Sequence, residues 1–343
     1  MEISLTTSRF IGVIIILTII FSIIAAGYLW PSQTWEDKNT IVLYGFSVKG
    51  EVFDEKIIPA FESYWEDKTG KDLRFQTQYA GSGTITQQVI TGAKAEVMIL
   101  STEWDAIQLR KEGCVKTDWN GFPFNGTLSK SPWVILVRQG NPKGISNFAD
   151  LAEDGIELIH ADPLTSGGAC WSIFSIYGSE LIRTEFSEGK PNATAAKQLV
   201  NGIVDNVISW QSSARNALSQ FLLGYGDALI TYENEALLTK QQGEKIELVY
   251  PKCTIYSEHK VVKVDKNLKS YEDEVIDEFI EFLFTQDVQE YLADYHFRSV
   301  NDNINNQHGE FKAILTPFTV EYLGGWEKAH EDLIEGVFKE VKD

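Results

Sequence analysis

The stretch Asp162-Pro163-Leu164-Thr165-Ser166-Gly167-Gly168-Ala169-Cys170-Trp171 joins a strand-like run to a segment with helical spacing of apolar residues. A Ser-Gly-Gly turn at this place leaves backbone N–H groups free where a helix begins, and the helix dipole adds a partial positive charge there. Such a loop is suited to an anion. For one loop alone, an ordinary strand-to-helix turn is the better explanation, so the interpretation depends on similar loops elsewhere.

Two further loops have the same design. Residues 80–84 (AGSGT) and 211–215 (QSSAR) each follow a strand-like run and precede a helical segment. In sheets with helices on their faces, ligands bind beyond the carboxyl ends of the strands, where helices begin. We therefore expect the three loops to converge on one anion. Arg215 is the cation beside them, and we expect it to pair with a carboxylate or to be exposed at its helix start.

Strand-like and helical segments alternate almost throughout the chain. This order predicts an α/β fold with parallel-rich sheets and helices on both faces. A chain of 343 residues is long enough for one large domain or two lobes.

The chain is acidic, with a formal net charge of -19. This argues against a nucleic-acid partner, because phosphate backbones are bound by basic patches. It also means that a bound anion must be held by local dipoles against an unfavourable overall field.

The N-terminal region contains an uncharged apolar run, residues 10–30, of about the length needed to span a bilayer. We predict a flank at 1–9, a transmembrane anchor or signal segment at 10–30 and a linker at 31–39. Ala25-Ala26-Gly27 is a possible cleavage site, so a signal peptide is the competing interpretation. The main body is then expected outside the cytoplasm.

The three cysteines, Cys114, Cys170 and Cys253, are an odd number for an exported chain. One pair could form a disulfide, or all three could be buried thiols. Neither they nor the five scattered histidines have metal-ligand spacing, so we predict no metal site and no cofactor.

Several segments match the motifs of one known family in order: Gly81-Ser82-Gly83, 136–143 (LVRQGNPK), Ser166-Gly167-Gly168-Ala169, Ser213-Ala214-Arg215, 233–238 (ENEALL) and 324–329 (GGWEKA). On these residues the chain resembles the sulfate/thiosulfate-binding proteins, the solute receptors of sulfate ABC importers. The resemblance covers about residues 41–341. It implies a monomeric, extracytoplasmic receptor with a two-lobed periplasmic-binding-protein-like fold of type II, which closes about a hinge and delivers its ligand to a membrane permease.

We expect lobe 1 to comprise residues 40–132 and 256–343, and lobe 2 to comprise residues 133–255. The chain would then cross between the lobes near 128–133 and return near 250–259, and a third crossing stays open.

The resemblance also implies the donors to the anion. They are the backbone N–H groups of Ser82, Gly167, Gly168 and Ala214, one near Val48, the hydroxyl of Ser166 and a side chain at Tyr232. Independently of the resemblance, Arg215 is a secondary candidate because it is the cation near the loops. The family has a tryptophan where this chain has Tyr232, whose hydroxyl can both donate and accept. Cys170 stands where family members often have a basic residue.

Sulfate only accepts hydrogen bonds near neutral pH, whereas hydrogen phosphate still carries a proton that needs an acceptor. A site made of donors therefore favours sulfate or thiosulfate, and a carboxylate facing the site would favour phosphate. The carboxylates in question are Asp162 and Glu103. We expect Asp162 to cap a turn and Glu103 to open a helix. The alternative ligand is another oxyanion: phosphate, molybdate or tungstate.

An enzyme is the third hypothesis, and the residues do not favour it. A Gly-x-Ser-x-Gly nucleophile elbow is absent at both glycine loops, because Ala80 and Leu164 occupy its first position. His160 lies near Ser166 in sequence, but we expect it to pack in the core or a loop.

Overall fold

The computed structural model describes residues 39–269 and 272–342. The predicted flank, anchor or signal segment and nearly all of the linker (1–38) lie outside these residues. Across the described ranges, none of the helices combines the length and apolar character needed to cross a membrane.

Strands alternate with helices, as predicted. The strands are β1 (Thr40–Phe46), β2 (Arg74–Ala80), β3 (Val97–Leu100), β4 (Thr127–Arg138), β5 (Leu158–Ala161), β6 (Val207–Gln211), β7 (Ala228–Tyr232), β8 (Ile246–Val249), β9 (Cys253–Lys263), β10 (Arg298–Ser299) and β11 (Thr316–Phe318). The main helices are α3 (Ile58–Thr69), α4 (Ser82–Ile90), α5 (Glu103–Lys111), α6 (Gly167–Glu188), α7 (Ala193–Asp205), α8 (Ala214–Leu222), α9 (Glu233–Gln241), α10 (Asp273–Phe282) and α11 (Gln286–Asp294).

Shorter helical segments lie at both ends of the described chain and between its longer elements, including Trp119–Gly121, Pro123–Gly126, Phe148–Ala152, Asp265–Asn267 and Val320–Leu323. A turn at Ser47–Lys49 leads through α2 (Gly50–Val52) and a wide turn at Phe53–Ile57 into α3. At the other end, α12 (Asp302–Asn305) is followed by α13 (Trp326–Ala329), a wide helical stretch at His330–Phe338 and α14 (Lys339–Lys342).

The two longest strands, β4 and β9, form the centre of a sheet with the order β2-β1-β3-β9-β4-β7-β5-β6. They pair with each other in antiparallel fashion from Thr127 to Pro132 of β4. Beyond that segment β9 pairs with β3, and β4 pairs with β7 and β8. The sheet therefore has two halves that share β4 and β9: half I with β1, β2 and β3, and half II with β5, β6, β7 and β8.

Pairing is parallel between β1 and β3 and between β5 and both β6 and β7, as alternation predicts. The pairs that β4 and β9 make with each other and with β3, β7 and β8 are antiparallel, so the sheet is mixed. The prediction of a parallel-rich sheet thus holds within each half but not at its centre.

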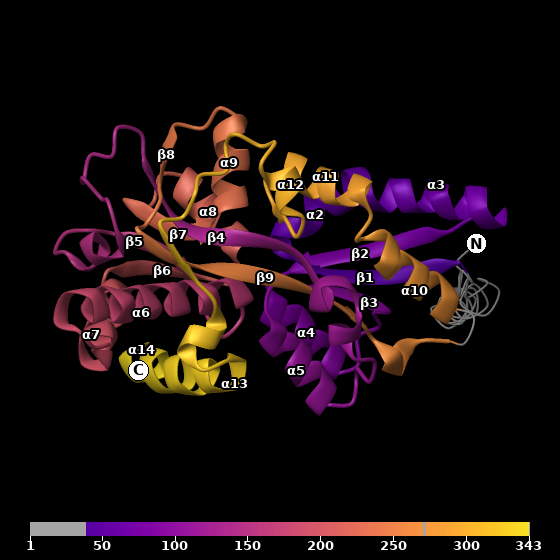
Figure 1. Ribbon diagram of the computed structural model, residues 1–343, viewed down its shortest axis with the longest axis horizontal. Helices are drawn as coiled ribbons and strands as arrows, with labels where there is room; N and C mark the ends of the chain where they lie inside the picture. The colour runs from indigo at the N-terminus through magenta and orange to yellow at the C-terminus, as the bar shows by residue number, and fades with distance from the viewer. Residues whose placement is uncertain (1–38, 270–271, 343) are drawn as a thin grey trace, which may run out of the picture. The chain divides into compact units, whose positions relative to one another are not determined.

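Each half of the sheet has helices on both faces. In Figure 1, α3 and α11 lie on one side of the β1–β2 strands and α4 and α5 on the other. In the second half, α8 and α9 lie on one side and α6 and α7 on the other (Figure 1). The buried apolar core includes Phe61 and Phe279 in half I and Trp133 and Phe174 in half II.

The C-terminal segment packs on half II. The ring of Trp326 lies 4.5 Å from Trp171 and 5.6 Å from Phe174 of α6, and Phe338 lies 5.3 Å from Trp210 of β6. The same segment also contacts half I, because the ring of His330 stacks on that of Trp104 of α5 at 4.1 Å. The assignment of residues 256–343 to lobe 1 therefore stays a prediction.

The cysteines are unpaired. Cys114 and Cys170 are buried and Cys253 is half-buried, so of the two interpretations the structure has the free thiols. The Cys170 thiol lies 3.2 Å from the carbonyl oxygen of Pro163, and burial raises the pKa of that thiol.

Candidate functional site

The predicted backbone donors occupy the first turns of three helices. Ser82 is the first residue of α4, Gly167 and Gly168 are the first two of α6, and Ala214 is the first of α8. N–H groups in a first helical turn have no acceptor within their own helix, and the helix dipole makes that end positive. Each of these groups is therefore placed to donate to something outside its helix.

The three loops meet at Gly81. A β-carbon on this residue would lie 2.4 Å from the carbonyl oxygen of Thr165 and 2.6 Å from that of Ser212. The Thr84 N–H also donates to the Thr165 carbonyl oxygen at 3.2 Å, and the Thr165 hydroxyl donates to the Ser212 carbonyl oxygen at 3.1 Å. The loops before α4, α6 and α8 therefore lie against one another, and their convergence on an anion stays a prediction. Gly81 is glycine because side chains do not fit there.

Tyr232, at the carboxyl end of β7, lies beside the start of α6. A β-carbon on Gly168 would lie 2.8 Å from its hydroxyl oxygen. That oxygen is 2.6 Å from the hydroxyl of Ser101, which follows β3. Burial raises the pKa of Tyr232, so the phenol keeps its proton. Val48 lies in the turn after β1, against which α8 packs, and its side chain is buried.

The serines of the three loops use their hydroxyls differently. Ser213 caps α8 by accepting from the Asn216 N–H at 3.2 Å. The Ser82 hydroxyl donates to Asp105 at 2.6 Å and accepts from the Ser101 N–H at 3.0 Å. Ser166, the N-cap of α6, is buried and makes no side-chain capping bond. Its hydroxyl is therefore the one least committed to the helix that it precedes.

The start of α6 is held by the second turn of the helix. The indole N–H of Trp171 donates to the Ser101 carbonyl oxygen at 2.7 Å. The hydroxyl of Ser172 lies 2.6 Å from Nε2 of His160, whose Nδ1 lies 2.6 Å from the Ala161 carbonyl oxygen. Burial lowers the pKa of His160 to about 4. This histidine packs in the core, as expected.

The two carboxylates that would favour phosphate are engaged elsewhere. Asp162 accepts from the Leu164 N–H at 2.9 Å, which caps the turn before α6. Glu103 opens α5 and accepts from the indole N–H of Trp119 at 3.0 Å. Both expectations for these residues are confirmed.

Arg215 pairs with two carboxylates. Its guanidinium contacts Glu235 of α9, with Nη2 2.6 Å from Oε1, and it makes two contacts with Glu51 of α2. Burial alone would lower the pKa of Arg215, but Glu235 and Glu51 raise it. Of its two expected fates, the structure has the carboxylate partner.

Three residues near these loops were not predicted from the sequence. Asp105 is buried, and its carboxylate accepts from the hydroxyls of Ser82 and Thr102; burial raises its pKa although these bonds lower it. Ser101 joins Tyr232 to Trp171. Lys49 follows Val48 and is fully buried. The capping pattern Thr102-x-x-Asp105 could have indicated Asp105, because an N-cap hydroxyl commonly faces the residue three positions on.

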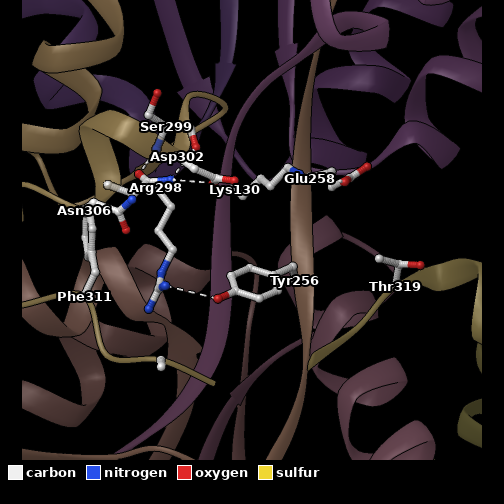
Figure 2. A pocket seen from close by; sticks show the side chains of 11 residues that line it. Lys130, Tyr256, Glu258, Arg298, Ser299, Asp302, Asn306, Phe311 and Thr319 are labelled. Atoms are coloured by element: carbon white, nitrogen blue, oxygen red, sulfur yellow. Dashed lines mark hydrogen bonds and ion pairs between the residues drawn. The ribbon is translucent and has the colours of Figure 1, made fainter. Parts of the chain in front are cut away.

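A separate cavity of about 520 Å³ lies where β4, β9 and β10 meet the segment after α12 (Figure 2). Its cations are already paired: Arg298 with Glu233 and with the hydroxyl of Tyr256, and Lys130 with Glu258 at 3.6 Å. This cavity is therefore a less favourable site for an anion than the three helix starts, because its cations already have partners.

Comparison with known proteins defines the class. Residues 49–298 match the family model described as bacterial extracellular solute-binding protein, and the chain belongs to this family. Its members are binding proteins and not enzymes.

The relatives are more specific. The chain is 34% identical over 296 residues to the sulfate-binding protein of Synechococcus elongatus, a match that covers 85% of this chain and 83% of that protein. It is 29% identical over 318 residues to the thiosulfate-binding protein of Escherichia coli, covering 90% of each. The solved structure of the sulfate-binding protein SubI from Mycobacterium tuberculosis aligns with a TM-score of 0.77 at 30% identity, covering 86% of this chain and 99% of SubI. The two-lobed α/β fold predicted from the sequence is thereby confirmed.

Proposed function

We propose that this chain binds sulfate or thiosulfate as the extracytoplasmic receptor of an ABC importer. The observation that carries the proposal is the meeting of three helix starts at Gly81, beside a serine whose hydroxyl does not cap its own helix. Hydrogen-bond donors aimed at one point suit an ion that only accepts hydrogen bonds. The names of the relatives agree with this chemistry.

In the proposed complex, first-turn N–H groups and two hydroxyls surround the anion. The donors are the backbone N–H groups of Ser82, Gly167, Gly168, Ala214 and the turn at Val48, with the hydroxyls of Ser166 and Tyr232. Hydrogen bonds to a charged group contribute roughly 1.5–3 kcal/mol each. Several of them, less the costs of desolvation and closure, reach the roughly -8 kcal/mol of micromolar binding. Arg215 would act indirectly, by holding α8 against Glu51.

The choice among oxyanions depends on the hydroxyl pair of Tyr232 and Ser101. Their oxygens are 2.6 Å apart, and either can be the donor. A tyrosine hydroxyl can accept as well as donate, whereas an indole N–H in its place would only donate. This pair is the feature that supports the alternative, a protonated oxyanion such as hydrogen phosphate, because it can provide an acceptor. Asp162 and Glu103 give that alternative no support, since their carboxylates bind other groups.

Titration calorimetry with sulfate, thiosulfate, phosphate and molybdate tests the proposal. We expect sulfate or thiosulfate to bind with about micromolar affinity or better, and phosphate to bind at least about 100-fold more weakly. Clear binding of phosphate without binding of sulfate would reverse the assignment within the same fold.

We propose that the binding protein closes about β4 and β9, the strands that the two sheet halves share. In this scheme lobe 1 contains half I and lobe 2 contains half II. The contacts of Trp326 and Phe338 with α6 and β6 favour placing residues 316–342 in lobe 2, with a third crossing before β11. Small-angle scattering with and without sulfate would measure the closure.

We further propose that residues 10–30 either anchor the protein to the outer face of the cell membrane or direct its export before cleavage, and that the receptor delivers its ligand to a permease as a monomer. The length and apolar character of this run support the proposal. Membrane fractionation with N-terminal sequencing distinguishes an anchor from a cleaved signal. Recovery of the intact chain in the cytoplasm would contradict both.

A further inference from the structure

Lys49 is a buried cation-forming group next to the proposed anion site. It follows Val48 in the turn after β1, and its side chain is fully buried. Its Nζ donates to the Ser129 hydroxyl of β4 at 2.6 Å and lies 3.4 Å from the ring centre of Phe297. Lysine side chains are almost never fully buried without a partner of opposite charge.

Among residues 39–269 and 272–342, no carboxylate contacts Nζ. Ser129 lies on β4, His259 on β9, Phe46 at the end of β1 and Phe297 just before β10. Within the described part of the chain, the titratable group that faces Nζ is His259, whose Nδ1 is 2.9 Å from the Ser129 hydroxyl. Burial holds the pKa of Lys49 well below its ordinary value, and no carboxylate in the described part of the chain counteracts this effect. Burial and then Lys49 also lower the pKa of His259.

The cluster of Lys49, Ser129 and His259 packs against Phe46 and Tyr232, which lie next to the proposed anion site. The ring of His259 is 5.6 Å from the ring of Tyr232 and 4.8 Å from that of Phe46. Tyr232 in turn contacts Gly168 at the start of α6. The rings of Phe46, His259 and Tyr232 therefore lie between Lys49 and the proposed ligand position. Charges interact more strongly across such a buried region than across water.

We propose that Lys49 takes up a proton when the oxyanion binds, so that the protein places one positive charge behind a site of neutral donors. This inference depends on the proposed function, because the dianion is what favours the charged lysine. The Ser129 hydroxyl accepts a hydrogen bond from the ammonium group, and the face of Phe297 stabilises its charge. The proton comes from solvent, and sulfate itself stays fully ionised.

Calorimetry on the full-length protein in mild detergent tests the proposal. Sulfate is titrated at pH 7 in Pipes and in Tris, whose heats of ionisation differ widely. We expect the binding heat to differ between the buffers by an amount that corresponds to uptake of up to about one proton per sulfate. Because protons are taken up, affinity should fall as the pH rises, by at most about tenfold per pH unit.

The variant Lys49→Met keeps the length of the side chain and removes the amine. It should bind sulfate about tenfold or more weakly and take up no proton, while its thermal unfolding without sulfate stays at or above that of the wild type. The matched control is Lys71→Met, at an exposed position after α3, which should retain the uptake.

The outcomes separate the two proposals. Sulfate binding with equal heats in both buffers and a flat affinity between about pH 6 and pH 9 would overturn the role of Lys49 and leave the proposed function intact. Undiminished proton uptake in Lys49→Met would also overturn it. Absence of binding by every oxyanion tested would instead refute the proposed function. The two wild-type measurements remain decisive even if the variant does not fold.

Discussion

The starts of α6 and α8 come from loops of similar composition, yet they are stabilised differently. At α8 the N-cap Ser213 accepts from the Asn216 N–H and satisfies its own helix. At α6 the N-cap Ser166 makes no such bond. Instead, Trp171 and Ser172 in the second turn fix the helix to Ser101 and His160.

This difference separates stability from binding. The Ser213 hydroxyl is committed to the fold, because an N-cap bond stabilises a helix by about 1 kcal/mol. At α6, the contacts of Trp171 and Ser172 hold the helix start in place without an N-cap bond. The Ser166 hydroxyl is therefore available to a ligand. Two loops that look alike in sequence thus have different roles, and the following variants test the distinction.

Gly81→Ala should have the largest effect, because both loops meet at this residue. The added β-carbon would lie 2.4 Å from the Thr165 carbonyl oxygen and 2.6 Å from that of Ser212. The φ of -58° permits alanine, so the damage would come from forcing the loops apart. We expect calorimetry to show that sulfate affinity falls by at least about 100-fold, or ~2.7 kcal/mol.

The control for this variant is Gly121→Ala, where an added β-carbon would have no neighbour within 4 Å. It should bind sulfate like the wild type. If Gly81→Ala binds within about threefold of the wild type, the three starts need not approach one another as closely as they do here.

His160 should make the support of α6 dependent on pH. Burial lowers its pKa from 6.5 to about 4, so its stabilising contribution is complete above about pH 6.5 and is lost as the pH falls towards 4. The loss should approach about 3 kcal/mol. His160→Gln can still bond to Ser172 and should remove this part of the pH dependence, as measured by urea unfolding at pH 7.5 and 4.5.

An identical loss of stability for His160→Gln and the wild type between the two pH values would show that another group is responsible.

Ser166→Ala and Ser213→Ala compare the N-cap hydroxyls of α6 and α8 directly. We expect Ser166→Ala to weaken sulfate binding by roughly 1.5–3 kcal/mol, the contribution of one hydrogen bond to a charged group. Ser213→Ala should lower the free energy of unfolding by about 1 kcal/mol and change affinity little. Calorimetry and urea unfolding measure the two effects, and the reverse pattern would refute the assignment.

Ser82→Ala should have the smallest effect on binding. Only the backbone of Ser82 is proposed to contact the anion, since its hydroxyl donates to Asp105. Removing the hydroxyl leaves a buried carboxylate with one donor fewer, so stability should fall by about 1–3 kcal/mol. A loss of affinity equal to that of Ser166→Ala would mean that the Ser82 hydroxyl also reaches the ligand.

Sequence periodicity failed at the strands that connect the two halves. The apolar-rich runs at 132–138 and 260–264 mark only parts of β4 and β9, which are both longer. The missing segments contain buried polar residues that satisfy one another: the Ser257 hydroxyl donates to the Ser131 carbonyl oxygen at 2.7 Å, and Ser129 bonds to His259. Such pairs between distant segments leave no hydrophobic pattern in either one.

The sequence by itself determined the alternation of strands and helices, the three loops and their family motifs, because these depend on neighbouring residues and glycine-serine turns. Only the tertiary structure decided which serine hydroxyl is free, which acid supports Ser82 and that Lys49 is buried. These properties depend on side chains brought together from β3, α5, β4 and β9. The difference between the starts of α6 and α8 is of this second kind, since it is decided by His160 and Ser101 and not by either loop.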